Sequence, residues 1–357
     1  MILVVNAGSS TLKLRLVGPD DQVAAAHDID PWEGRDVELP DALRAAGAVG
    51  HRVVHGGPQF LDATLVDDDV VARIAALTPL APLHQPRAVA GIRAVRAALP
   101  DVPAVACFDT AFHTTMPPAA ATYALPEEWR QRWNLRRYGF HGLSHAYAAQ
   151  RAAELVDRPV ADLRIVSCHL GAGASLCAVA GGRSVDTTMG FTPLEGLVMN
   201  TRSGSVDPGL VLWLVTEAGL DAAEVARALD ERSGLSGLAG PPGDLRSILP
   251  SDDPRASLAV AVYVHRLRRE IAAMAAAMNG LDALVFTGGV GEHLPVIRTA
   301  AADGLGFLGV VLDAKRNEAT TTDGEITAAG ASVRTVVVTA REDVEIARQV
   351  RRVVPQS

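Results

Sequence analysis

Short runs of apolar and β-branched residues recur along the chain and predict buried strands. Between them lie longer stretches rich in Ala and Arg, which predict helices over 85–99 and 257–279. Because strands and helices alternate, the pattern is typical of an α/β fold. The predicted strands are 2–5, 12–17, 104–108, 165–169, 176–180, 283–287 and 335–338.

An internal repeat divides the chain into two similar halves. The segment ILVVNAGSSTLKLRLV (2–17) aligns without a gap with IVSCHLGAGASLCAVA (165–180). Each copy predicts a β-hairpin whose Gly-rich tip exposes backbone N–H groups suited to phosphate, although in one hairpin alone such residues would simply form the turn. We therefore expect two domains, 1–147 and 148–342, with a last helix (343–357) joining the first domain.

Composition limits the possible functions. The 357 residues exceed one ordinary core, and 48% hydrophobic with 21% charged residues indicates a soluble globular protein. The formal charge of −8, without a basic run, argues against nucleic acid and anionic membranes as partners. No leader or membrane-length apolar segment is evident, and Cys107, Cys168 and Cys177 lack CxxC spacing. These features favour reduced thiols and a cytoplasmic location.

Two nucleotide-binding patterns are excluded. The segment GLGFLG (304–309) matches a dinucleotide fingerprint, but a helical stretch precedes it and we expect a strand after it. No GxxxxGK[ST] motif occurs, so phosphate chemistry must use another fold.

Several polar residues could act on a phosphoryl group, whose transfer needs cations, hydrogen-bond donors and a metal. Arg52 in GHRVVHGG and Arg202 in MNTRSGSVDPG could bind a carboxylate and a phosphate, although each alone is also explained as a surface arginine. Asp109 ends a predicted strand and could orient an arginine, hold metal-bound water or cap a turn.

His141 and His145 lie four residues apart in RRYGFHGLSH, a spacing that often indicates zinc. Gly142 between them would interrupt a helix and no third ligand is near in sequence, which disfavours zinc. We expect a helix to begin at His145 with Ser144 as its N-cap, and His141 to donate to a phosphoryl oxygen.

Two later segments also suggest ligand contacts. Gly288, Gly289 and Gly291 in LVFTGGVGEH would let backbone approach adenosine or phosphate closely. Glu342 and Asp343 follow a strand and begin a helix, where either could bind Mg²⁺ or simply favour the helix dipole.

Taken together, the order of these motifs and their amino-acid sequences resemble those of the acetate kinase family, which belongs to the acetate and sugar kinase, heat-shock protein and actin superfamily. The resemblance spans nearly the whole chain. It is carried by the segments NAGSSTLKL, HRVVHGG, APLHQP, CFDTAFH, RRYGFHGLSH, HLGAGAS, DTTMGFTPLEGLVMNTRSG and FTGGVGE.

The resemblance implies two ribonuclease-H-like, actin-like domains with an interdomain cleft, a homodimer, and Mg²⁺- or Mn²⁺-dependent phosphoryl transfer between ATP and acetate, giving ADP and acetyl phosphate. By motif it places Asn6 and Glu342 at the metal, Arg52 and Arg202 at acetyl phosphate, Asp109 as acidic partner and His141 with Arg202 at the transition state. The implied nucleotide contacts are Thr11, Lys13, His169, Gly171, Ala172, Gly173, Asp244, Leu245, Arg246, Gly289, Val290, Gly291 and His293.

The chain departs from the family pattern on the nucleotide side. Ala172 and His293 replace asparagines, and Ser205 replaces a frequent aspartate. The segment after Val17 is short, and ARED replaces a TNEE-like sequence. The donor could therefore be ATP, another triphosphate or pyrophosphate.

Two rival interpretations stay open. A kinase for propionate or butyrate is one, because an apolar pocket formed by Val54, Leu83 and Pro193 cannot be sized from sequence. The other is a nucleotide-binding module that has lost turnover, suggested by Ala172 and His293. The sequence leaves the direction of the reaction and the preferred acid open.

Overall fold

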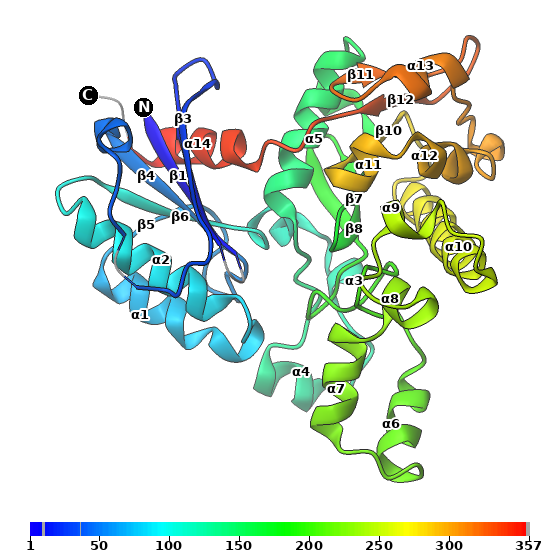
Figure 1. Ribbon diagram of the computed structural model, residues 1–357, viewed down its shortest axis with the longest axis horizontal. Coiled ribbons are helices and arrows are strands. Elements are labelled where there is room, and N and C mark those ends of the chain that lie inside the picture. Colours follow the sequence, from blue (N-terminus) through cyan, green and yellow to red (C-terminus); the bar gives the residue numbers. More distant parts are fainter. Residues whose placement is uncertain (9–10, 36, 355–357) are drawn as a thin grey trace. The chain divides into compact units, whose positions relative to one another are not determined.

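The computed structural model describes residues 1–8, 11–35 and 37–354, which form two compact units (Figure 1). The first unit comprises described residues of 1–114, 140–147 and 341–354, and the second comprises 115–139 and 148–340. Residues 115–139 thus group with the second unit, whereas the sequence analysis placed them in the first domain. The chain passes between the units at four points.

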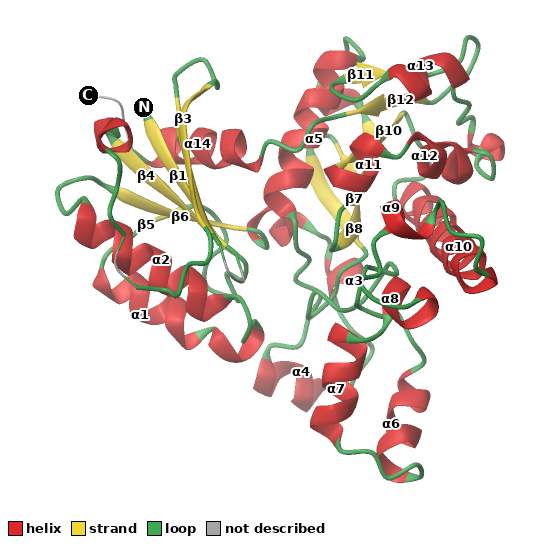
Figure 2. Ribbon diagram, in the orientation of Figure 1, coloured by secondary structure: helices red, strands yellow, loops and turns green. Residues whose placement is uncertain are grey.

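The first unit contains a six-stranded sheet in the order β3-β2-β1-β4-β6-β5 (Figure 2). β1 pairs antiparallel with β2 and parallel with β4, and β4 pairs parallel with β6. The strands are β1 (Ile2–Ala7), β2 (Leu12–Val17), β3 (Val23–Ile29), β4 (Ala48–Val53), β5 (Thr64–Leu65) and β6 (Ala104–Phe108).

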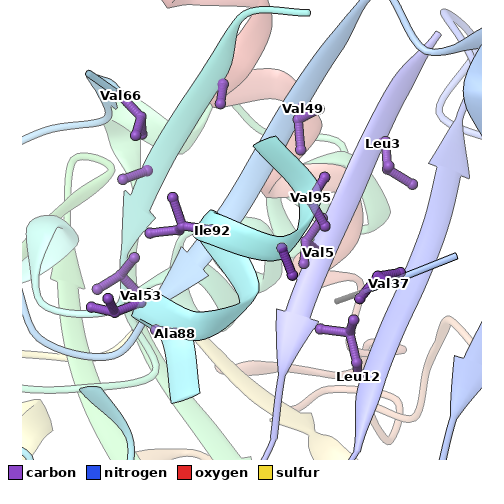
Figure 3. Close-up of a cluster of buried hydrophobic side chains, with 14 of the residues drawn as sticks. Leu3, Val5, Leu12, Val37, Val49, Val53, Val66, Ala88, Ile92 and Val95 are labelled. Carbon is purple, nitrogen blue, oxygen red and sulfur yellow. The ribbon is translucent and has the colours of Figure 1, made fainter. Parts of the chain in front are cut away.

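Both faces of this sheet are covered, so its central strands are buried on both sides. Leu3 and Val5 of β1 pack in a cluster with α1 (Asp68–Ala76) and α2 (Gln85–Ala98) (Figure 3). The alternate residues Ile2 and Val4 point to the opposite face because side chains alternate along a strand.

Helix α14 (Glu342–Val353) covers this opposite face with Ile346, Ala347 and Val350. It approaches β4 closely at Gly50, where an added Cβ would lie 2.5 Å from Ile346 Cγ2 and 2.7 Å from Val350 Cγ2. A glycine is therefore needed for this helix to lie so near the sheet.

The second unit contains a six-stranded sheet in the order β11-β12-β10-β7-β8-β9. Read in reverse, this order repeats the first sheet strand for strand, with β7 in the place of β1 and β10 in the place of β4. Both predicted hairpins, β1–β2 and β7–β8, are confirmed as antiparallel pairs. The strands are β7 (Arg164–Leu170), β8 (Ala174–Ala180), β9 (Arg183–Thr187), β10 (Ala283–Thr287), β11 (Gly324–Glu325) and β12 (Arg334–Val337).

Both predicted helices are present. The predicted helix 85–99 corresponds to α2 of the first unit, and the predicted helix 257–279 corresponds to the long helix α10 (Pro254–Ala277) of the second unit.

Helices also account for most of the remaining second unit. The other helices are α3 (Pro118–Ala121), α4 (Glu127–Trp133), α5 (Gly142–Leu155, which begins in the first unit), α6 (Pro208–Thr216), α7 (Ala222–Glu231), α8 (Gly234–Ala239), α9 (Leu245–Ile248), α10 (Pro254–Ala277), α11 (Gly288–His293), α12 (Pro295–Ala302) and α13 (Ala314–Ala319), with short 3-10 helices at Asp41–Ala45, Thr78–Leu80, Ala111–Thr115, Val160–Asp162 and Gly306–Leu308.

Two local predictions were wrong. Helix α5 begins at Gly142, not at His145, because the N–H of Gly142 is already satisfied by the Asp109 carbonyl and Ser144 lies inside the helix. After Gly309 the structure forms two isolated bridges, Val310 with Val333 and Leu312 with Thr327, and not the expected strand.

The three cysteines are buried and unbonded to each other, as predicted. Burial raises the pKa of the Cys177 thiol to about 12. Among the described residues, helices of sufficient length and apolar character to cross a bilayer do not occur.

Candidate active site

Three polar side chains lie at the carboxyl ends of adjacent parallel strands of the first unit. Asn6 is near the end of β1, Arg52 near the end of β4, and Asp109 directly after β6. Parallel strands bring such residues to one edge of the sheet, where α/β proteins bind ligands. Arg52 donates from Nε and from an Nη to the two carboxylate oxygens of Asp109, at 3.0 and 2.7 Å.

This pair is bidentate and protected from solvent. The Asp109 side chain is 1% exposed and that of Arg52 is 21% exposed. The other Arg52 terminal nitrogen lies 3.4 Å from Oδ1 of Asn6. Of the alternatives considered for Asp109, orientation of an arginine is the one the structure displays, because two parallel hydrogen bonds fix the guanidinium plane.

Glu342, the first residue of α14, completes this cluster. One of its carboxylate oxygens lies 3.5 Å from Nε of Arg52. Burial raises the pKa of Glu342, and the Asp109 charge adds to this effect while Arg52 opposes it. Although burial alone would lower the pKa of Arg52, the charges of Asp109 and Glu342 raise it above its ordinary value.

The cluster of Asn6, Arg52, Asp109 and Glu342 fits a hard divalent cation by its chemistry. It contains two carboxylates and an amide oxygen, all of them hard oxygen ligands, beside one guanidinium. Oxygen ligands of this kind suit Mg²⁺ or Mn²⁺, and Mg²⁺ usually keeps several waters. Groups of three or more His, Cys, Asp or Glu suited to a metal are absent from the described part of the chain.

His141 lies near this cluster, because the backbone of the next residue, Gly142, is hydrogen-bonded to Asp109. It has a φ of +56°, an unusual conformation for a residue with a side chain. The N–H of Gly142 donates to the carbonyl oxygen of Asp109 at 2.9 Å, and a Cβ at Gly142 would lie 2.2 Å from that oxygen. The glycine therefore lets the backbone of His141 approach that of Asp109.

Lys13 and Thr11 lie on the β1–β2 hairpin of the same unit. Lys13 is exposed on β2 and is paired in register with Asn6, and its charge acts on the Glu342 carboxylate. Thr11 accepts at its backbone carbonyl from the N–H of Gly8 at 2.7 Å, which closes the described part of the hairpin tip. Lys13 thus lies on a strand next to β1, and Thr11 immediately precedes that strand.

In the second unit, two of the predicted nucleotide segments meet at one sheet edge. His169 of β7 pairs in register with Thr287 of β10, at the carboxyl ends of two parallel strands. After β7 the N–H of Gly171 donates to the carbonyl of Gly173 at 3.0 Å, forming a tight turn around Ala172. The hairpin tip predicted from the repeat is therefore confirmed as a turn beside β10.

The glycines after β10 form part of helix α11 itself. The space around an added Cβ at Gly289 is open for 4 Å, while Gly291 packs against Phe286. Val290 is buried and His293 is exposed. Gly289 is thus the place on α11 where a ligand could approach backbone most closely.

Arg202 is held by a residue that the sequence analysis missed. Its Nε donates to Oδ1 of Asp230 at 2.9 Å, with 22% of the arginine side chain exposed. The neighbouring N–H of Asn200 donates to the carbonyl of Ala172 at 3.1 Å, so the Arg202 loop and the Gly171 turn are connected.

The remaining predicted residues are more dispersed. Asp244 caps α9 by accepting from the N–H of Arg246, and the Leu245 side chain is buried in the core at 1% exposed. Leu83, in the first unit, is 58% exposed. The sequence analysis placed it in an apolar pocket with Val54 of the same unit and Pro193 of the second unit. That apolar pocket stays a prediction.

Two further charged residues, one on α11 and one on α12, escaped the sequence analysis. Glu292 accepts hydrogen bonds from the backbone N–H groups of Gly288 and Ala340. Arg298, 0% exposed, donates to the carbonyls of Gly291 and Glu292 at 2.8 Å. Glu292 stands inside the quoted motif GGVGEH, but only its glycines and His293 were considered. No sequence pattern marked Arg298, because the sequence alone does not distinguish a buried arginine from an exposed one.

Comparison with known proteins gives one consistent result. The model of the Acetokinase family matches residues 35–348. A protein named acetate kinase from Bacillus cereus is 42% identical, with 98% of each chain covered. An acetate kinase from a Synechococcus strain is 49% identical over 88% of this chain and 78% of its own.

Solved structures agree with this result. The crystal structure of Porphyromonas gingivalis acetate kinase has a TM-score of 0.91 and 35% identity, with 99% of each chain covered. A propionate kinase from Francisella tularensis has the same TM-score at 34% identity, again over 99% of each chain. The family model covers well over half of the residues, and the similarity extends along nearly the full length of the Bacillus cereus and Porphyromonas gingivalis proteins. The chain therefore belongs to the acetokinase family, and its α/β units have the two-domain actin-like fold of that family.

Proposed function

We propose that this chain is an acetate kinase that transfers a phosphoryl group reversibly between ATP and acetate. In the forward direction an acetate oxygen attacks the γ-phosphorus in line, the bond to the β–γ bridging oxygen breaks, and acetyl phosphate and ADP form. The observation that carries this proposal is the bidentate Arg52–Asp109 pair beside Asn6 and Glu342, in a chain of this family.

The proposed acyl side uses two arginines. Arg52, with its plane fixed by Asp109, binds an oxygen pair of acetyl phosphate, and Arg202, held by Asp230, binds the same substrate. His141 donates to an equatorial oxygen, and Arg202 adds charge, as the phosphoryl group flattens in the transition state. The acyl chain packs against Val54, Leu83 and Pro193.

Metal binding is proposed at Asn6 and Glu342. A bound Mg²⁺ or Mn²⁺ supplies positive charge to the phosphate oxygens of the nucleotide. The carboxylate and amide oxygens of the cluster support this assignment, because hard cations prefer such ligands. Glu342 binds metal in its ionised form, so a nearby cation would oppose the rise in its pKa that burial causes.

The nucleotide is proposed to bind mainly to the second unit. The turn at Gly171–Gly173 and the open backbone at Gly289 would receive phosphates or adenosine through N–H groups. The full proposed set also includes Thr11, Lys13, His169, Ala172, Asp244, Leu245, Arg246, Val290, Gly291 and His293.

A substrate and donor matrix tests the proposed function. Purified protein is incubated with hydroxylamine, Mg²⁺, and acetate, propionate or butyrate, each with ATP, GTP or pyrophosphate, and acyl hydroxamate is measured. We expect the highest kcat/KM for acetate with ATP. Preference for propionate would instead match the relative from Francisella tularensis, and absence of hydroxamate from every pair would favour a nucleotide-binding module without turnover.

The proposed assembly is a homodimer in the cytoplasm. Helix α6 is apolar on all sides, yet no residue in it is buried, and Leu212 and Trp213 are 64% and 54% exposed. A helix of this composition normally packs against other apolar surface. We propose that a second copy of the chain covers it. The three buried thiols fit a reducing compartment.

A further inference from the structure

Glu292 is a buried carboxylate that the proposed catalytic roles leave unused. It lies on α11 and is 7% exposed. Its Oε1 atom accepts two backbone hydrogen bonds, from Gly288 at 2.9 Å and from Ala340 at 3.0 Å. Burial of a carboxylate is unfavourable unless hydrogen bonds compensate it, and here both come from backbone groups of separate segments.

One of these segments is the start of α11. Gly288 has a φ of +77°, and an added Cβ there would lie 2.8 Å from the carbonyl oxygen of Leu170. Leu170 immediately precedes the Gly171 turn. The first bond of Glu292 therefore fixes the point where the two proposed nucleotide segments of the second unit lie against each other.

The other segment leads to Glu342. Ala340 is the last residue of the second unit before the chain enters the first, and Glu342 follows two residues later. The preceding N–H, of Thr339, is held separately by Asp323 at 2.8 Å. The short connection to the proposed metal carboxylate is thus attached to α11 through the Glu292 oxygen.

Arg298, on α12, anchors the end of α11 to neighbouring segments of the second unit. It donates to the carbonyls of Gly291 and Glu292 at the end of the helix and to the side chain of Asn317 at 2.7 Å. A ligand that shifts the backbone at Gly288 and Gly289 would therefore shift the N–H group bound to Glu292 Oε1, while the end of α11 stays held. Because one oxygen serves both N–H groups, Ala340 must follow or its hydrogen bond must lengthen.

We propose that Glu292 is a positioning residue that couples nucleotide binding at α11 to the placement of Glu342 for metal binding. This inference rests on the proposed function for the location of the two ligands. Its consequence is a linkage: Mg²⁺ and nucleotide should strengthen each other's binding through this carboxylate, by equal factors in both directions.

Calorimetric titration of the full chain with ADP, with and without Mg²⁺, tests the coupling without turnover. We expect Mg²⁺ to tighten ADP binding to the unmodified chain. Glu292→Ala should reduce that factor by about tenfold, since an allosteric coupling of this size is typical. Glu292→Gln, which keeps an acceptor oxygen, should stay within about twofold of the unmodified chain, as expected when the hydrogen bonds persist.

Glu292→Asp provides a second variant if the alanine variant does not fold. It keeps the charge but is shorter by one methylene group, so it should reach one N–H group at most and lose the coupling. Asp282→Ala is the matched control. Asp282 also accepts a backbone N–H, from Arg164 at 2.9 Å, but at the opposite ends of β7 and β10. It should lower the thermal midpoint and leave the coupling factor unchanged.

The proposal is overturned if Glu292→Asp or Glu292→Ala retains the full Mg²⁺ effect on ADP binding, if Asp282→Ala loses it equally, or if Mg²⁺ has no effect on the unmodified chain. Failure of the proposed function is a different result. It would appear as absence of acyl hydroxamate from the unmodified chain, while the ADP titrations still report the coupling.

Discussion

Arg52 and Asp109 face each other across β4 and β6 through two parallel hydrogen bonds of 3.0 and 2.7 Å. The carboxylate is buried, so the guanidinium has one preferred plane before any substrate arrives. Preorganised donors of this kind stabilise charge that develops in a transition state without reorganisation.

Asp109→Asn should therefore lower kcat/KM for acetate by about a hundredfold or more, the effect of losing one preorganised donor. The amide presents an N–H group to the guanidinium and leaves Arg52 free to rotate. Acyl hydroxamate formation over a range of acetate concentrations measures the change. Asp28→Asn is the control, because Asp28 pairs with Arg15 at the exposed edge of the same sheet. Equal losses in both variants would refute a special role for the buried pair.

Gly142→Ala should destabilise the first unit and reduce activity. An added Cβ would lie 2.2 Å from the Asp109 carbonyl oxygen, so the backbone of Asp109 or of His141 must shift. We expect a loss of about 3 kcal/mol in the free energy of unfolding, typical of overpacking in a rigid site. Chemical denaturation measures it. Gly289→Ala is the comparison, since its Cβ meets open space, and it should leave stability nearly unchanged. A stable, fully active Gly142→Ala protein would contradict the geometry.

His51 should make the first unit sensitive to acid. Burial, with a contribution from the Arg96 charge, lowers the pKa of its imidazole to about 3, and its Nε2 atom has no hydrogen-bond partner among the described residues. The unfolded chain takes up a proton near pH 6.5 while the folded chain does not. The free energy of unfolding should therefore fall as the pH falls below about 6.5, by about 1.4 kcal/mol per pH unit from this residue.

His51→Leu removes this contribution. Urea denaturation at pH 7 and pH 5 should give a smaller difference for the variant than for the unmodified chain. Subtracting the variant's difference from that of the unmodified chain isolates the His51 contribution, because the other titrating groups act equally in both proteins. An identical pH dependence in both would show that His51 is protonated in the folded state.

Helix α6 provides a test of assembly. Leu212→Glu together with Trp213→Glu should convert the proposed dimer into monomers, since charge is introduced where apolar surface would be buried. Sedimentation velocity measures the change. Leu258→Glu, at a 58% exposed position of α10, is a control for surface charge alone. A monomeric unmodified chain would reject the dimer.

Much of the fold could be predicted from the sequence because its signals are local. The hairpins β1–β2 and β7–β8 carry both the alternation and the Gly-rich tips that form them, and their repetition predicted two similar sheets. The start of α5 could not be predicted, because its first N–H is satisfied by Asp109, a residue far away in the chain.

For the candidate site, too, the residues within local motifs could be predicted, and those defined by tertiary contacts could not. The motifs identified Arg52, Asp109 and Glu342, which the structure brings together in one cluster. Asp230 and Arg298 were missed because their partners, Arg202 and the carbonyls of α11, are defined only by tertiary structure. Roles that depend on bound substrate stay predictions.

Helix α14 has a consequence for biosynthesis. It supplies Ile346 and Val350 to the face of the first sheet that carries Ile2 and Val4, yet it is translated after every other described element. While the ribosome is still synthesising the second unit, the apolar residues on this sheet face are exposed to solvent and can associate with other chains. The nascent first unit is therefore a candidate client for chaperones, and the emergence of α14 from the ribosome is the step that completes its core.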